Sequence, residues 1–165
     1  GDVNGDGFGD ILIGADHYEN GQSGEGRAFA YYGSALGLSG SPAWTKESNL
    51  VNGMFGQSVS TAGDVNGDGY SDVLIGSPGY TNIETGEGKA ELYLGSSLGL
   101  GSTAAWSIES NQQDAGLGSA VSLAGDVNGD GYSDILVGVP WFGHEVEMMM
   151  NHESILVKPL VQITL

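Results

Sequence analysis

The chain has 165 residues, with 30 Gly, 4 Pro and no Cys, and 39% of the residues are hydrophobic. This share of apolar residues excludes a disordered linker in spite of the glycine content. The formal net charge is −17, from 21 acidic and 4 basic residues. Because nucleic-acid binding requires clustered Lys and Arg, we expect no nucleic-acid partner. No apolar run is long enough to span a bilayer, so no transmembrane segment is expected.

The segment Gly-Asp-Val-Asn-Gly-Asp-Gly occurs three times, beginning at Gly1, Gly63 and Gly125. The spacing is 62 residues both times, and about half of the positions in 1–62 recur in 63–124 without a gap. Self-similarity at a fixed period indicates one structural unit repeated along the chain. The chain therefore holds about two and two-thirds units. Because it starts at Gly1 rather than Met, we expect a mature or trimmed chain.

Short apolar stretches bounded by Gly, Ser and Asn predict strands throughout the repeats. The first unit lacks the first of its four strands, and the third unit has only the first two. In the middle unit, 72–76 is apolar on both faces, which predicts a strand buried between two sheets. Four short antiparallel strands per unit are typical of a β-propeller blade, so the predicted fold class is all-β. The predicted strands of the middle and third units are 56–62, 72–76, 89–95, 104–109, 118–124 and 134–138.

The predicted domain organisation follows the repeat. It consists of a partial blade over 1–48, a full blade over 49–110, a partial blade over 111–142 and a non-repeat tail over 143–165. The ring is incomplete unless the chain is oligomeric or part of a longer protein. In the tail, 144–157 could form a helix and 155–165 an extended strand interrupted by Pro159.

Each repeated segment has the composition of a metal-binding loop. Side-chain oxygens stand at positions one, three, five and nine of 2–10, 64–72 and 126–134, and position seven offers a backbone carbonyl. The two internal glycines tolerate the positive φ of a tight loop. Six or seven oxygen ligands suit calcium, whereas zinc requires His or Cys. We expect three calcium sites with the ligands Asp2, Asn4, Asp6, Phe8, Asp10, Asp64, Asn66, Asp68, Tyr70, Asp72, Asp126, Asn128, Asp130, Tyr132 and Asp134.

Two other interpretations of the segment are weaker. Asp, Asn and Gly also favour ordinary turns, but three copies that keep every ligand position make turn chemistry alone a poor explanation. An EF-hand requires Glu at position twelve, where this chain has Ile13, Ile75 and Val137.

Loop, strands and period together resemble the FG-GAP repeats of integrin α-subunit β-propellers. The name describes Phe-Gly at the start of strand one and Gly-Ala-Pro after strand two. The middle unit has Phe55-Gly56 with Gly76-Ser77-Pro78, and the third has Leu117-Gly118 with Gly138-Val139-Pro140. The resemblance covers about 1–142 and implies calcium in the hairpin between the first two strands of each blade. That family usually closes seven blades, more than this chain supplies.

These observations favour a secreted, extracellular or cell-surface calcium-binding propeller module for adhesion or ligand binding, without catalytic activity. An unknown protein or glycan ligand would contact rim loops such as 16–24 and 79–85. One alternative is a self-assembling ring or fibre, completed by strands from other copies, and another is a domain accompanying a secreted hydrolase. No nucleophile-elbow motif is present. Because Trp44 and Trp106 recur at one blade position, we expect them to pack between blades rather than to form a carbohydrate platform.

Overall fold

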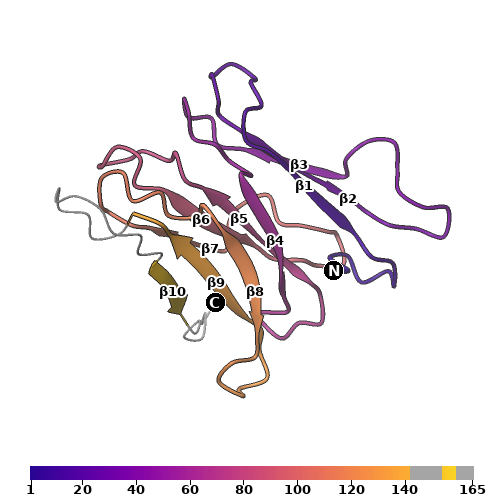
Figure 1. Cartoon of the computed structure of the whole chain (residues 1–165). Coiled ribbons are helices and arrows are strands. Elements are labelled where there is room, and N and C mark those ends of the chain that lie inside the picture. The colour runs from indigo at the N-terminus through magenta and orange to yellow at the C-terminus, as the bar shows by residue number, and fades with distance from the viewer. Residues whose placement is uncertain (142–153, 159–165) are drawn as a thin grey trace.

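The computed structural model describes residues 1–141 and the backbone of 154–158, and all regular secondary structure in this part of the chain is β. The ten strands found there form three antiparallel sheets, ordered β1-β2-β3, β4-β5-β6-β7 and β10-β9-β8 (Figure 1). Their bounds are β1 (Ile11–Ala15), β2 (Arg27–Tyr31), β3 (Trp44–Glu47), β4 (Ser58–Gly63), β5 (Asp72–Ser77), β6 (Lys89–Tyr93), β7 (Trp106–Glu109), β8 (Val121–Gly125), β9 (Asp134–Val139) and β10 (Ser154–Lys158). The predicted all-β fold of partial propeller blades is confirmed, and the ring is open.

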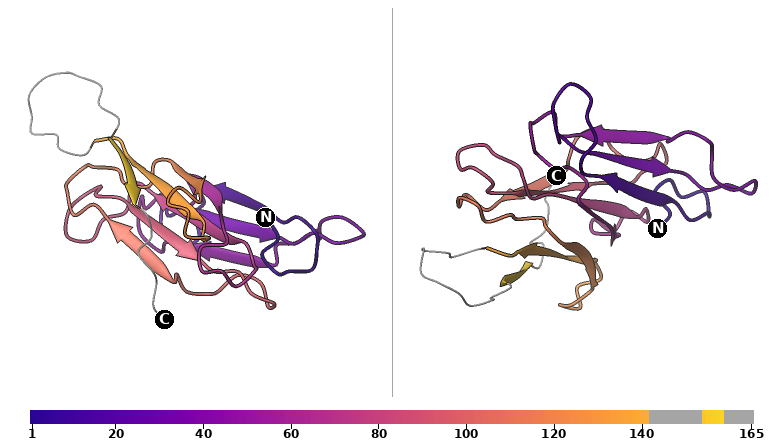
Figure 2. Two further views of the ribbon diagram at one scale, coloured as in Figure 1. Left: turned by 90° about the horizontal axis from the view of Figure 1, so that it is seen from below. Right: turned by 45° about the horizontal axis from the view of Figure 1, so that its top comes forward.

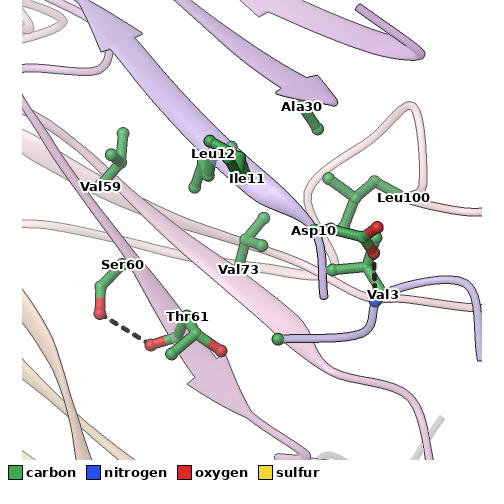
Figure 3. A pocket seen from close by; sticks show the side chains of 11 residues that line it. Val3, Asp10, Ile11, Leu12, Ala30, Val59, Ser60, Thr61, Val73 and Leu100 are labelled. Atoms are coloured by element: carbon green, nitrogen blue, oxygen red, sulfur yellow. Dashed lines mark hydrogen bonds between the residues drawn. The ribbon is translucent and has the colours of Figure 1, made fainter. Parts of the chain in front are cut away.

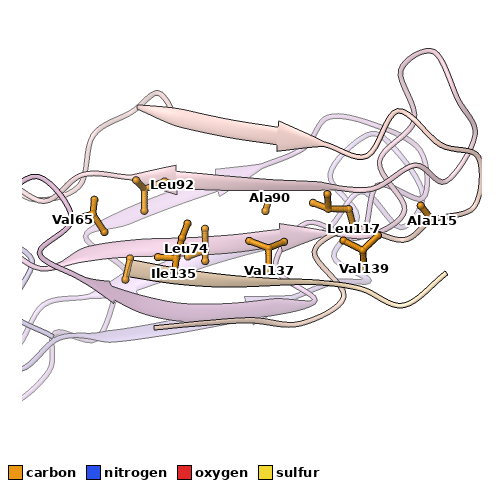
Figure 4. Close-up of a cluster of buried hydrophobic side chains, with 10 residues drawn as sticks. Val65, Leu74, Ala90, Leu92, Ala115, Leu117, Ile135, Val137 and Val139 are labelled. Carbon is orange, nitrogen blue, oxygen red and sulfur yellow. The ribbon is translucent and has the colours of Figure 1, made fainter. Parts of the chain in front are cut away.

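The second sheet lies between the other two (Figure 2). All six residues of its strand β5 are buried. Leu74 packs against Ile135 and Val137 of the third sheet (Figure 4). Val73 and Ile75 belong to the cluster formed with the first sheet. The apolar character of 72–76 on both faces is thus explained by burial against two neighbours, as predicted.

Strand β6 shows how side-chain alternation serves two interfaces at once. Ala90 and Leu92 point into the cluster shared with the third sheet, whereas Tyr93 points into the cluster shared with the first. There the ring of Trp44 meets that of Tyr93 edge-on, with centroids 5.2 Å apart. The indole N–H of Trp44 donates to the carbonyl of Gly101 at 2.9 Å. The expected packing role of Trp44 is therefore confirmed, since its ring fills space between two sheets.

Glycines at one repeat position in the first two sheets, Gly14 of β1 and Gly76 of β5, allow the backbones of neighbouring sheets to approach closely. A Cβ added to Gly14 would lie 1.9 Å from the carbonyl oxygen of Gly56, and one added to Gly76 would lie 1.9 Å from that of Gly118. No other residue fits there without moving the backbone. The repeated Gly at the end of the apolar stretch therefore contacts the Gly of the Phe-Gly or Leu-Gly pair at the start of the next blade.

The first sheet has three strands, as expected for a unit without strand one. Among the described residues, β1 pairs only with β2. Ile11 and Ile13 are 44% and 47% exposed, whereas the equivalent Val73 and Ile75 in the second sheet are 4% and 0% exposed. The difference arises because the second sheet has a neighbour on this face.

The third sheet contains a strand from the non-repeat tail. Strand β10 pairs antiparallel with β9, and Ser154 lies opposite Val139. In the second sheet Lys89 of β6 lies opposite Ser77 in the same way. The tail therefore supplies a third strand although its sequence does not repeat. The helix predicted over 144–157 is wrong for 154–157, and the rest of that prediction, like 159–165, lies outside the described residues.

Within the described residues, no helix is long and apolar enough to cross a bilayer.

Candidate metal centres

The three predicted metal loops, here called the Asp loops, comprise 2–10, 64–72 and 126–134. The first precedes β1, and the others join β4 to β5 and β8 to β9. A β-bulge precedes each of these hairpin loops, where the pairing shifts between Thr61 and Gly63 and between Leu123 and Gly125. The glycines at positions four and six have φ angles between 71° and 92° in all three copies. This confirms their predicted role, because L-residues with a side chain rarely adopt such angles.

The carboxylate at position one organises each Asp loop. In the middle copy, Oδ1 of Asp64 accepts the backbone N–H of Gly67 at 2.7 Å and Oδ2 accepts that of Gly69 at 2.8 Å. Asn66 and Asp68 each accept a further backbone N–H, from Asp68 and Tyr70, at 3.0 Å. The same bonds recur in the other two copies. In the first copy, the backbone N–H of Gly7 contributes most to lowering the pKa of Asp2.

The carboxylate at position nine ties the loop to the sheet. Asp72 is fully buried, and its two oxygens accept the backbone N–H groups of Val65 and Gly95, both at 2.9 Å. Burial raises the pKa of Asp72 to about 6 in spite of these bonds, and the neighbouring charges of Asp68 and Asp64 act in the same direction. Asp10 makes the equivalent pair of bonds.

The oxygens of these loops fit a hard cation by their chemistry. Each loop combines three carboxylates, one amide and one backbone carbonyl, and none contains Lys, Arg, His or Cys. In the described part of the chain, however, no three His, Cys, Asp or Glu side chains form a group that could hold a metal ion. The carboxylates instead accept backbone N–H groups, mostly of their own loop and, for Asp10 and Asp72, also of Gly33 and Gly95. The assignment of the fifteen predicted ligands therefore remains a prediction.

The turns at the opposite ends of β1 and β5, 16–25 and 78–87, contain a second repeated polar group and are here called the Glu loops. Glu25 and Glu87 are fully buried, and one oxygen of each accepts the backbone N–H of Asn20 or Asn82. Their other oxygens have no hydrogen-bond partner among the described protein atoms. The sequence showed that Glu25 and Glu87 recur, but nothing in it predicted that these acids are buried.

Each Glu loop is accompanied by a basic residue. The guanidinium of Arg27 lies 4.9 Å from the ring centre of Tyr18, and its Nε lies 3.5 Å from Glu47. In the second sheet the equivalent contacts of Lys89 are 4.7 Å to Tyr80 and 3.6 Å to Glu109. The tips of the two Glu loops differ in sequence. Each loop nevertheless has its own equivalent network of a basic residue, a tyrosine and a glutamate.

A cavity of about 230 Å³ lies between β1 and the strands β4 and β5 (Figure 3). It is lined mainly by aliphatic side chains, including Leu12, Val59 and Val73. The carboxylate of Asp10 borders it, but both oxygens of that group already accept backbone N–H groups. Ligand sites combine an apolar lining with a few polar groups free to orient a ligand. Ser60 and Thr61 also line the cavity, but their hydroxyls donate to the backbone carbonyls of Thr61 and Asp72. We therefore interpret the cavity as space between sheets.

Within residues 1–141, the one histidine adds no candidate site. His17 is exposed, and its Nδ1 lies 3.1 Å from Oδ1 of Asp16. His144 and His152 lie outside the described residues.

The repeats match the family model described as FG-GAP repeat over residues 1–30, 55–94 and 117–147. These ranges cover more than half of the chain, so the protein belongs to the FG-GAP repeat family. The resemblance seen in the sequence is thereby confirmed.

Curated relatives include several integrin α-subunits. Integrin alpha-PS2 of Drosophila melanogaster is 36% identical over 151 residues, which is 83% of this chain and 11% of that protein. Integrin alpha-4 of Xenopus laevis is 30% identical over 148 residues, 83% of this chain and 13% of the relative. Phosphatidylinositol-glycan-specific phospholipase D of Bos taurus is 34% identical over 150 residues, 85% of this chain and 18% of the relative. The chain thus spans less than one fifth of the length of these relatives.

Proposed function

We propose that the chain is a non-catalytic, calcium-binding propeller module of a secreted or cell-surface protein and serves adhesion or ligand binding. One observation carries this proposal. Three loops with the same ligand-type side chains each contain three carboxylates and no basic residue. A divalent cation in each loop would offset this repulsion, and oxygen-only ligands favour calcium over zinc.

The side chains at positions one, three, five and nine would hold the ion, with the carbonyl at position seven. Bound calcium would supply positive charge and rigidity to the hairpin. The backbone N–H groups that hold Asp64 and Asp72 in place keep two of these carboxylates oriented before binding. Less ordering is then needed on binding, which favours affinity.

The adhesion role is supported by relatives whose names are those of integrin α-subunits. Loops carry most binding functions of rigid β scaffolds. We therefore propose the tips of the Glu loops as the contact region for a protein or glycan ligand. The blade boundaries proposed above, 1–48, 49–110 and 111–142, would place one Asp loop in each blade.

Two further candidates each have one supporting observation. The half-exposed Ile11 and Ile13 on the first sheet favour a neighbouring blade on that face, from a longer chain or from a second copy. The phospholipase D relative favours a module that accompanies a hydrolase.

Calcium titration of chelator-treated protein by isothermal calorimetry tests the main proposal. We expect three sites, and we expect Asp6→Asn, Asp68→Asn and Asp130→Asn, all at position five, to remove one site each. Asp16→Asn changes an acid outside the Asp loops and serves as the matched control. Absence of binding at millimolar calcium, or a stoichiometry unchanged by Asp68→Asn, would contradict the proposal.

A further inference from the structure

Neighbouring Asp loops are joined directly to each other by hydrogen bonds. The backbone N–H of Ser71 donates to the backbone carbonyl of Asp2 at 2.9 Å, and the backbone N–H of Asp2 donates to Oγ of Ser71 at 3.2 Å. Ser133 and Asp64 form the same two bonds, at 3.0 and 3.2 Å. Position eight of one loop is thus paired with position one of the loop before it, twice in the chain.

An aromatic contact accompanies each pair of hydrogen bonds. A Cβ added to Gly5 would lie 2.6 Å from Cε1 of Tyr70, and one added to Gly67 would lie 2.6 Å from Cε1 of Tyr132. The ring at position seven of one loop therefore rests against the tight turn of the preceding loop. Any rearrangement of that turn must move the ring or leave a void beside it.

The peptide unit between Tyr70 and Ser71 belongs to both loops. Its carbonyl is the predicted position-seven ligand of the loop 64–72. Its N–H donates to Asp2, the position-one residue of the loop 2–10. Since hydrogen bonds and charge–dipole contacts on one amide polarise each other, a cation on the carbonyl strengthens the N–H as a donor.

A second connection exists between the first two Asp loops. Oδ1 of Asp72 accepts the N–H of Gly95 at 2.9 Å, and the next residue, Ser96, donates its N–H to the carbonyl of Val3 at 3.0 Å. The turn after β6 therefore contacts a predicted ligand of one loop and the backbone of the other.

From these contacts we propose that cation binding in neighbouring Asp loops is positively coupled through the Tyr70–Ser71 and Tyr132–Ser133 peptide units. The proposal rests on the cation binding proposed above. Occupancy of one loop fixes the backbone of its position-one residue, and this residue positions the carbonyl ligand of the next loop. By linkage the effect is reciprocal. Ser71 and Ser133 are not predicted ligands. We assign them the role of positioning the neighbouring loop through their bonds to Asp2 and Asp64.

The chain contains its own matched control. In the loop 2–10 the corresponding residues are Phe8 and Gly9. Phe8 is 41% exposed, and a Cβ added to Gly9 would meet nothing within 4 Å. Phe8→Ala therefore makes the same kind of truncation as Tyr70→Ala, and both keep the backbone carbonyl, but only Tyr70 touches another Asp loop.

The test is a thermodynamic cycle on the first two loops. Asp130→Asn disables the third loop in every protein compared. Adding Asp68→Asn or Asp6→Asn then leaves only the first or only the second loop active, and calorimetric calcium titration gives each intrinsic affinity. The protein with both loops active gives the coupling factor, which we expect to be about five-fold or more. In a Tyr70→Ala/Ser71→Ala background we expect this factor to fall to within about two-fold of unity, whereas Phe8→Ala leaves it unchanged.

Each outcome of this cycle is informative. A coupling factor of one with both loops active overturns the coupling and leaves three independent calcium sites. A factor that survives Tyr70→Ala/Ser71→Ala overturns the proposed route, because these truncations remove the ring contact with Gly5 and the Oγ acceptor of the Asp2 N–H. If no protein binds calcium, the proposed function fails, and the coupling fails with it. Circular dichroism of each variant verifies folding. The Hill coefficient of the unmodified chain, compared with that of Tyr70→Ala alone, gives a second measurement that needs no disabled loop.

Discussion

The Asp loops and the Glu loops lie at opposite ends of the same strands, and both contain acidic residues, but they differ in how this charge is compensated. Each Asp loop holds three carboxylates and no basic residue. At the Glu loops, by contrast, Arg27 and Lys89 pair with Glu47 and Glu109. Two of the chain's 4 basic residues are thus placed at this end.

This difference separates two sources of stability in one repeat. The Glu-loop end carries its own counter-charges, so its stability should not require a bound cation. The Asp-loop end has only uncharged donors to stabilise its carboxylates, namely backbone N–H groups and the side-chain amide at position three, and like charges remain close together. We therefore expect the first end to be insensitive to divalent cations and the second to depend on them.

Removal of calcium should have the largest effect. A ligand present at 100 times its Kd stabilises the folded state by about 2.7 kcal/mol per site, and 1 kcal/mol shifts the Tm by about 2–4 °C in a chain of this size. We expect the melting temperature in excess EDTA to fall at least about 10 °C below that in calcium. Differential scanning calorimetry with a magnesium control measures this. Equal melting temperatures with and without calcium would remove the distinction between the two ends.

Truncation of the buried acid in a Glu loop should have a smaller effect that calcium does not alter. Glu87→Ala removes the acceptor of the Asn82 backbone N–H in a partly buried hydrogen bond, and a donor left unsatisfied there costs about 1–3 kcal/mol. Glu87→Gln keeps a carbonyl acceptor and should retain most of the stability. Urea unfolding in calcium and in EDTA should show the same loss of unfolding free energy for Glu87→Ala. A loss that appears in only one of the two conditions would show that the ends are not independent.

The sequence predicted the repeating part of this fold well for a physical reason. Burial of β5 on both faces and positive φ at Gly67 and Gly69 are local demands, and apolar or glycine residues at fixed positions reveal them. The sequence did not predict that β10 pairs with β9 as the third strand of its sheet. This pairing depends on an open sheet edge rather than on a repeated pattern.

The candidate sites divide in a similar way. Ligand-type residues of the Asp loops are visible in the sequence because their spacing is regular. The pairing of Ser71 with Asp2 is not visible in the sequence, because it joins residues far apart in the chain. The recurrence of Ser at position eight in two of three loops was the one available signal. For Glu25 and Glu87, recurrence was visible, but an acidic residue in a turn is usually exposed, so burial could not be inferred.

Neutralising the basic residue beside a Glu loop should lower the unfolding free energy less than truncating the buried acid does. The side chain of Lys89 is 17% exposed and lies 3.3 Å from Glu91 and 3.6 Å from Glu109. We expect Lys89→Met to lower the unfolding free energy by about 1 kcal/mol, because two carboxylates lose a partly buried partner. Lys89→Arg reproduces the residue of the first sheet and should be nearly neutral. Denaturation at low and high salt provides the check, since screening should reduce the cost of Lys89→Met but would not reduce a packing defect.

The smallest effect is expected at the tip of the Glu loop, where the sequences of the two copies differ. Ile83 is 78% exposed, so Ile83→Ser removes little buried surface and should change the unfolding free energy by less than about 0.5 kcal/mol. Thermal melts of Ile83→Ser and Glu87→Ala, run side by side, compare an exposed tip with the buried residue that anchors it. If Ile83→Ser destabilises as much as Glu87→Ala, the tip is part of the packed network. It would then be a poor candidate for a surface that varies to suit a ligand.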